Sequence, residues 1–163
     1  MNLRLAEVAR AEAKKNYHGD TDAAISNLQP IAEVFSVADG ITLASLDRDW
    51  SGAFVFFCTE RAEMGLPIRY PDPRVRGCFA YVEAWEDYAR LPKIGLWRPV
   101  SEQPEEGDLV IFEPEAGKAP LMGIVTTVND TCMEVAVGNY RNHSALIERP
   151  LCAHVRGWIR IAD

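Results

Sequence analysis

An apolar run in the first half of the chain is the strongest constraint on the fold. The sequence SGAFVFFC begins at Ser51, and its last six residues are all apolar. A helix that is apolar all round is stable only when other elements cover it on every side. We therefore predict a buried central helix that begins at Ser51. Its hydroxyl is expected to be the N-cap, accepting the amide hydrogen of Ala53 or Phe54.

The segments around this run predict the elements that cover it. Apolar residues at helical spacing before Gly19 predict a first helix. A second helical pattern over 20–40 contains Pro30, which should kink or split it, so one short helix or a broken pair is expected, ending at Gly40. A loop rich in proline and glycine precedes an amphipathic helix over 78–91. After Pro104 the chain becomes rich in β-branched residues between turn signals. The strands are expected over 107–112, 121–128, 132–138, 144–150 and 155–161.

This order of elements predicts an α+β fold. We expect N-terminal helices and the buried central helix to pack on a largely antiparallel sheet of about five strands. The chain of 163 residues is expected to be a single domain, 1–163, with leading helices in 1–48 and a core in 49–161.

Composition narrows the classes of partner. Acidic residues number 24 against 17 basic ones, for a net charge of −7, so we expect no nucleic-acid partner. The N-terminus has no uninterrupted apolar stretch, so neither a signal peptide nor a membrane span is predicted. The expected location is cytoplasmic for the chain as written. It is outside the cell if a leader was removed or a dedicated secretion route is used.

Cysteine spacing gives no sign of a metal site or a dense disulfide framework. The cysteines occur without a CxxC pair, and buried free thiols are expected, with Cys78 the one that could be exposed after its proline-rich loop. No histidine, cysteine and carboxylate cluster has ligand spacing, and no glycine-rich phosphate loop occurs. We therefore predict neither a metal nor a cofactor. The cysteines are Cys58, Cys78, Cys132 and Cys152.

Several short motifs occur in a fixed order over residues 49–161. They are DWSGAFVFFCTERAEMG, KIGLW, EEGDLVIF, LMGIVTTV, VGN and RGWIRI. Together they resemble the CHAP amidases and the related NlpC-type cell-wall peptidases. This resemblance implies a papain-like fold. It also implies hydrolysis of amide bonds in peptidoglycan by a Cys-His pair that a third polar residue orients.

The resemblance assigns three positions to this chemistry. The nucleophile position is Ser51, the base position is Leu121, and the orienting position is Asn139. Leu121 has no titratable group and accepts no proton. A serine hydroxyl is a weaker acid than a thiol and needs a base more, so covalent catalysis is expected to be lost.

Other residues are candidates for binding or for a replacement base. Asp49, Trp50, Gly52 and Tyr140 are expected to line the cleft, with Asp47 near its mouth. An imidazole from His143 or His154 could in principle replace the missing base.

Three functions remain open from the sequence. The first is an inactive amidase-peptidase fold that binds a cell-wall peptide or a protein partner. The second is a cysteine peptidoglycan amidase or endopeptidase whose Cys and His were replaced deliberately. The third is an interaction domain unrelated to the cell wall. The sequence sets no oligomeric state.

Overall fold

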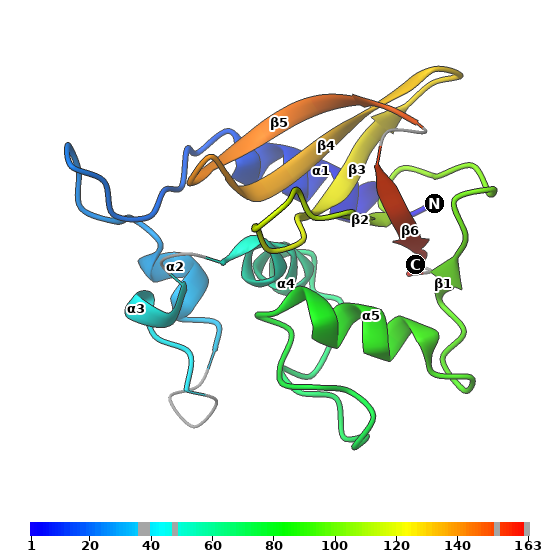
Figure 1. Ribbon diagram of the computed structural model, residues 1–163, viewed down its shortest axis with the longest axis horizontal. Helices are drawn as coiled ribbons and strands as arrows, with labels where there is room; N and C mark the ends of the chain where they lie inside the picture. The colour runs from blue at the N-terminus through cyan, green and yellow to red at the C-terminus, as the bar shows by residue number, and fades with distance from the viewer. Residues whose placement is uncertain (36–39, 47–48, 152–153, 162–163) are drawn as a thin grey trace.

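The chain folds into helices packed on an antiparallel sheet, as a computed structural model that describes residues 1–35, 40–46, 49–151 and 154–161 (Figure 1). The α+β prediction is therefore confirmed. The helices are α1 (Leu3–Ala13), α2 (Gln29–Ala32), α3 (Leu43–Leu46), α4 (Ser51–Arg61) and α5 (Val82–Arg90). The strands are β1 (Trp97–Arg98), β2 (Leu109–Phe112), β3 (Met122–Val128), β4 (Cys132–Tyr140), β5 (His143–Pro150) and β6 (Val155–Ile159).

The strands form one six-stranded sheet in the order β1-β6-β2-β3-β4-β5 within the described residues. Each neighbouring pair is antiparallel. The five predicted strands are present, and β1 is an additional short strand at the edge. Two residues are too few to give an alternating pattern, so the sequence carried no signal for β1.

Helix α4 is the buried central helix that the apolar run predicts. Every residue from Ser51 to Thr59 is buried. The helix packs on β3 and β4 and against α1, and Figure 1 shows it beneath these strands with α5 on its far side. Leu5 and Ala9 of α1 belong to the same core cluster as Phe54, so α1 and α4 cover the same face of the sheet.

The two faces of the sheet bury separate apolar clusters. In β2, Leu109 and Ile111 join the cluster around α4, whereas Val110 and Phe112 join a second cluster. This alternation follows from the twofold repeat of a strand. The second cluster contains Trp158 and residues of several strands but none from the helices in the described part of the chain.

In its described part, the segment over 20–40 forms one short helix, one of its two predicted forms, but Pro30 does not have its predicted role. The helical pattern over 20–40 is realised only as α2 and its turn, within the part that is described. Pro30 lies in the first turn of α2, where the missing amide hydrogen costs nothing. Pro30 therefore begins a helix instead of breaking one. The section over 36–39 lies outside the described residues.

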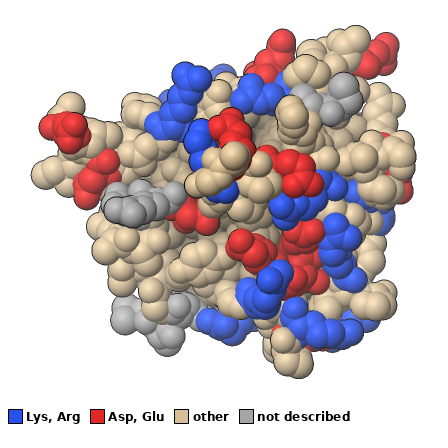
Figure 2. Space-filling view, viewed as in Figure 1, with Lys and Arg blue, Asp and Glu red and all other residues tan. Residues whose placement is uncertain are grey.

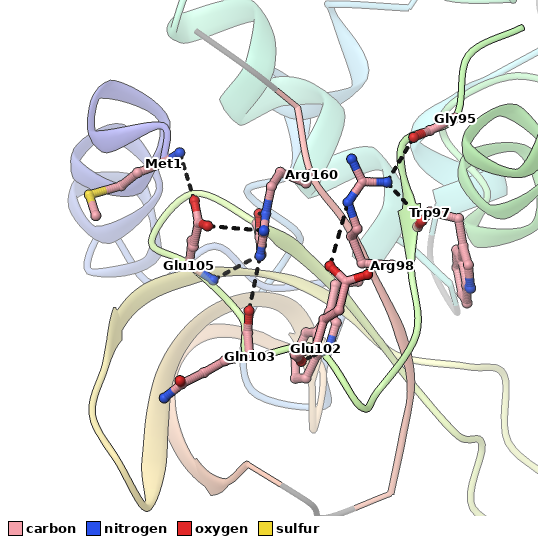
Figure 3. Close-up of polar contacts among 10 residues, drawn as sticks. Met1, Gly95, Trp97, Arg98, Glu102, Gln103, Glu105 and Arg160 are labelled. Carbon is pink, nitrogen blue, oxygen red and sulfur yellow. Dashed lines mark hydrogen bonds and ion pairs between the residues drawn. The ribbon is translucent and has the colours of Figure 1, made fainter.

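A network of charges holds the segment that connects β1 and β2 against the end of β6 (Figure 3). The Arg160 guanidinium lies 2.8 Å from Asp108 Oδ2 and 2.9 Å from Glu105 Oε1. Glu105 also pairs with the Met1 amine at 2.8 Å. Arg98 donates to the carbonyl of Gly95 at 2.8 Å. Because Asp108 is buried, Arg160 supplies the countercharge that its burial requires.

Candidate functional site

The hydroxyl of Ser51 joins the start of α4 to the start of β3. Its Oγ accepts the Met122 amide at 3.3 Å, and Ser51 is only 1% exposed. The N-cap residue is Trp50, whose carbonyl accepts the Phe54 amide at 2.9 Å and whose side chain makes no cap. The prediction that Ser51 caps the helix is therefore wrong. The hydroxyl is bound to the sheet instead.

Gly138 brings the end of β4 against the same helix start. A Cβ atom added there would lie 2.4 Å from Phe54 Cβ and 2.9 Å from Trp50 Cε3. Only a glycine lets the strand approach this closely. Asn139 follows with a positive φ of 59°, where the register of β4 against β5 shifts. The segments that carry Ser51, Leu121 and Asn139 therefore meet at one junction, which we call the α4 junction.

The Leu121 side chain packs away from α4. It contacts the second cluster, which includes Val110 and Val125. The side chain of the next residue, Met122, lies in the core around α4. The Leu121 carbonyl accepts the Phe112 amide at 2.9 Å, which holds this part of the chain in place. Among the described contacts, only the main chain next to Leu121 therefore lies beside Ser51.

Tyr140, at the end of β4, is half-buried beside two arginines and packs against the second cluster, on the face of the sheet opposite α4. The guanidinium carbons of Arg141 and Arg149 lie 5.5 and 5.4 Å from the centre of its ring. Arg149 Nη2 donates to the Tyr140 hydroxyl at 3.2 Å. This hydrogen bond and the nearby positive charges lower the pKa of Tyr140. Lys118 lies in the connection before β3, paired with Glu115, whose carboxylate also interacts with both arginines.

Asp49 lies two residues before the start of α4. Burial, with a smaller contribution from the negative charge of Glu83, raises the pKa of the Asp49 carboxyl to about 6. The start of α4 would favour the ionised form, but a partly buried carboxylate gains at most about 2 kcal/mol from a helix dipole. Burial therefore outweighs the helix.

We expect Asp49→Asn to stabilise the protein at neutral pH. Between about pH 4 and the folded pKa of about 6, the folded protein holds a proton on Asp49 that the unfolded chain has released. The free energy of unfolding therefore falls as pH rises through this window. After allowance for solvent screening, the variant should gain about 1 kcal/mol over the parent at pH 7, and this gain should vanish near pH 4.

Urea unfolding of both proteins at the two pH values measures this difference. Glu83→Gln is the matched control, because it removes the like charge and should give a smaller gain of the same sign. A loss of stability in Asp49→Asn at neutral pH would contradict this account of the carboxyl.

The other predicted cleft residues are buried. Trp50 is fully buried, and its Nε1 has no hydrogen-bond partner among the described residues. Gly52 is buried too, and a Cβ there would lie 2.7 Å from the Ala80 carbonyl oxygen. Asp49 and Tyr140 are thus the predicted binding residues that reach solvent. Asp47 lies outside the described residues.

The candidate replacement bases lie elsewhere in the fold. His143 Nδ1 bonds to Asn16 Oδ1 at 3.1 Å, and the carbonyl of the exposed His154 accepts the Glu113 amide at 2.7 Å. No hydrogen bond joins either imidazole to Ser51 in the part of the chain that the structure describes.

No cysteine that the structure describes is in a disulfide. Cys58 is buried, and its burial raises the pKa of the thiol. Cys78 is buried as well, so the expectation that it could be exposed is wrong. The chain after its loop turns inward to form the core under α5. Cys132 is half-buried, and Cys152 lies outside the described residues.

Two surface pockets lie away from the α4 junction. The larger, of about 580 Å³, is lined by residues that include Arg4, Met64 and Ile161, and the smaller, of about 270 Å³, by residues that include Glu102 and Trp158. The described part of the chain contains no group of three or more histidine, cysteine or carboxylate side chains placed to hold a metal ion. No helix within it has the length and apolar character to cross a membrane.

Sequence reasoning missed three features of the α4 junction. The Met122 amide is invisible to a search for reactive side chains. Gly138 was part of a motif, but its role as the contact point for α4 depends on the fold. Arg141 and Arg149 lie beside Tyr140 because β4 and β5 form a hairpin, and their spacing along the chain gives no such signal.

Comparison of the chain with protein-family models, with curated proteins and with solved structures finds no match.

Proposed function

We propose that this protein is a catalytically inactive member of the CHAP and NlpC-like amidase-peptidase group, with a papain-like fold, which binds a cell-wall peptide without cleaving it. The observation that carries the proposal is the engagement of Ser51. Its hydroxyl is buried and bound to the Met122 amide, and the neighbouring Leu121 side chain is apolar and directed elsewhere. A nucleophile with neither an adjacent base nor access to substrate does no covalent chemistry.

The arrangement of elements supports the papain-like part of the proposal. A buried helix begins against two neighbouring strands of an antiparallel sheet, and the motif residues Ser51, Leu121 and Asn139 belong to the three segments that meet there. Retention of this junction without its reactive groups fits a protein that keeps the fold of such an enzyme and has lost the chemistry.

The charges at the end of β4 support a peptide as the ligand. Arg141 and Arg149 flank Tyr140 there, on the face of the sheet that carries the second cluster. Paired guanidinium groups bind a carboxylate well, and the tyrosine ring adds contact area at low entropic cost. Figure 2 shows basic and acidic side chains interspersed over the visible face, so no large area of that face carries charge of one sign.

We expect Arg149→Gln and Arg141→Gln each to weaken binding of a cell-wall peptide about tenfold, because a hydrogen bond to a charged group contributes about 1.5–3 kcal/mol. The measurement is a titration with one peptide in two forms, a free carboxyl end and an amidated end. The free acid should bind the parent protein more tightly, and the variants should lose this preference.

Arg4→Gln is the matched control, because Arg4 is an exposed arginine paired with Glu63 at 2.7 Å near the larger pocket. Equal binding of both peptide forms, or an equal loss in Arg4→Gln, would contradict the proposed surface. Absence of any binding to cell-wall peptide would favour an interaction domain with another partner.

A further inference from the structure

Two histidines face each other across a short antiparallel pairing on the far side of the hairpin turn. His18 pairs with His143 in an isolated antiparallel bridge. The Gly19 amide donates to the Asn142 carbonyl at 3.3 Å. The Ser144 amide donates to the Tyr17 carbonyl at 2.7 Å. This pattern of bonds makes the two histidines a non-hydrogen-bonded pair, the position at which opposite side chains are closest.

The hydrogen bonds of both rings leave the same nitrogen free of a proton. His18 Nδ1 bonds to the Gly19 carbonyl oxygen at 2.9 Å, and His143 Nδ1 bonds to Asn16 Oδ1 at 3.1 Å. Both partners are acceptors, so each neutral ring carries its proton on Nδ1 and a lone pair on Nε2. Histidines that bind metals have this arrangement, in which an oxygen acceptor fixes the tautomer.

The separation of the rings suits one shared ion. An ion bound to an imidazole nitrogen at about 2.0–2.1 Å lies about 3.2 Å from the ring centre, so two rings can share it up to about 6.4 Å apart. The centroids of His18 and His143 are 5.8 Å apart, with the planes tilted by 44°. Both side chains are half-buried, so solvent reaches them.

We propose that His18 and His143 together bind one divalent transition-metal ion of the Zn²⁺, Ni²⁺ or Cu²⁺ class through their Nε2 atoms. Imidazole is a preferred ligand of these ions, and water completes the coordination. Ligand spacing along the chain gave no sign of this site because the two residues come from opposite ends of the sequence. The net charge of −7 favours a cation in general.

The bound ion would fasten the segment between α1 and α2 to the hairpin of β4 and β5. This segment passes beside His143 and has no helix or strand of its own over 19–28. Tyr140 is the strand partner of His143 in that hairpin, so the ion would lie next to the surface proposed for peptide binding. The metal site does not depend on that function.

The test is calorimetric titration of the full chain with Ni²⁺ near neutral pH. We expect His18→Gln and His143→Gln each to weaken binding about 100-fold, since loss of an outer partner alone costs about 10–100-fold. His154→Gln is the matched control, because His154 is the third histidine of the chain, and it should leave the affinity unchanged. Asn16→Ala should weaken binding about tenfold by removing the acceptor for His143 Nδ1.

A second measurement uses the unaltered protein. Substoichiometric Cu²⁺ should broaden the imidazole proton signals of His18 and His143 in NMR spectra and spare those of His154. Retained Ni²⁺ affinity in folded His18→Gln and His143→Gln, or broadening of all three histidines alike, would overturn the proposal.

Discussion

Replacing Gly138 with alanine is expected to lower the free energy of unfolding by about 3 kcal/mol. The new Cβ would lie 2.4 Å from Phe54 Cβ and 2.9 Å from the Trp50 ring. The Cβ of Phe54 is fixed to the main chain of α4, so the helix itself must move. Overpacking of a well-packed core costs about 1–3 kcal/mol, and a rigid neighbour puts this case at the upper end. Urea unfolding followed by circular dichroism gives the difference.

Gly65→Ala is the matched control for this result. Gly65 has a positive φ of 65° and no atom within 4 Å of its added Cβ, so the variant should lose only about 1 kcal/mol from backbone strain. If Gly138→Ala were as stable as the parent, the close approach of β4 to the start of α4 would be wrong. The α4 junction would then have no structural basis.

The second result that we expect is that the double variant Ser51→Cys with Leu121→His does not cleave peptidoglycan. Loss of the nucleophile and the base lowers the rate of a Cys-His hydrolase by about four to six powers of ten. The two substitutions introduce a thiol and an imidazole at the positions of these groups. The thiol would nevertheless lie at a position that is 1% exposed, and side chain 121 packs in the cluster on the other face of the sheet. Without a thiol–imidazole contact, the pair has no means of activation.

Alkylation of the introduced thiol tests, without any substrate, whether burial of position 51 is the reason for the missing activity. We expect iodoacetamide to modify position 51 at least about tenfold more slowly than a thiol introduced by Ser101→Cys, because burial disfavours the thiolate and blocks access. Ser101 is exposed, which makes it a suitable reference. Fast alkylation at position 51 with cleavage of peptidoglycan would instead support a hydrolase whose two reactive residues were replaced.

The helix at the centre of the fold was predictable because its signal is unambiguous. A fully apolar run such as SGAFVFFC has one stable solution, and α4 begins at the predicted residue. The five longer strands were predictable for a similar reason, since β-branched runs lie between turn residues. The antiparallel pairing of β2, β3, β4 and β5 followed from the short connections between them. Strand β6 instead pairs with β2 and β1, and not with β5, which precedes it in the sequence.

Other parts of the fold depend on tertiary contacts that leave little trace in the sequence. A proline marks the end of one helix or the start of another, and the helical pattern before Pro30 favoured the wrong choice. Strand β1 is two residues long and exists because β6 pairs with it. Cys78 is buried because the following residues pack under α5, although the loop before it contains prolines and glycines.

The candidate site was predictable as a set of positions and not as an arrangement of atoms. The motif order placed Ser51, Leu121 and Asn139 on segments that do meet. The direction of the Leu121 side chain depends on the register of β3 with its neighbours, and a shift of one residue reverses it. The hydrogen bond from the Met122 amide to Ser51 Oγ likewise depends on how β3 packs against α4, which the sequence does not specify.

The central claim is that this protein binds cell-wall peptide and leaves its amide bonds intact. The most direct measurement incubates the unaltered chain with purified peptidoglycan and determines, in the same sample, the protein that sediments and the amino groups that are released. The account predicts protein in the pellet and no amino groups above a protein-free blank. Release of new amino groups by the unaltered chain, in proportion to its concentration, would contradict it.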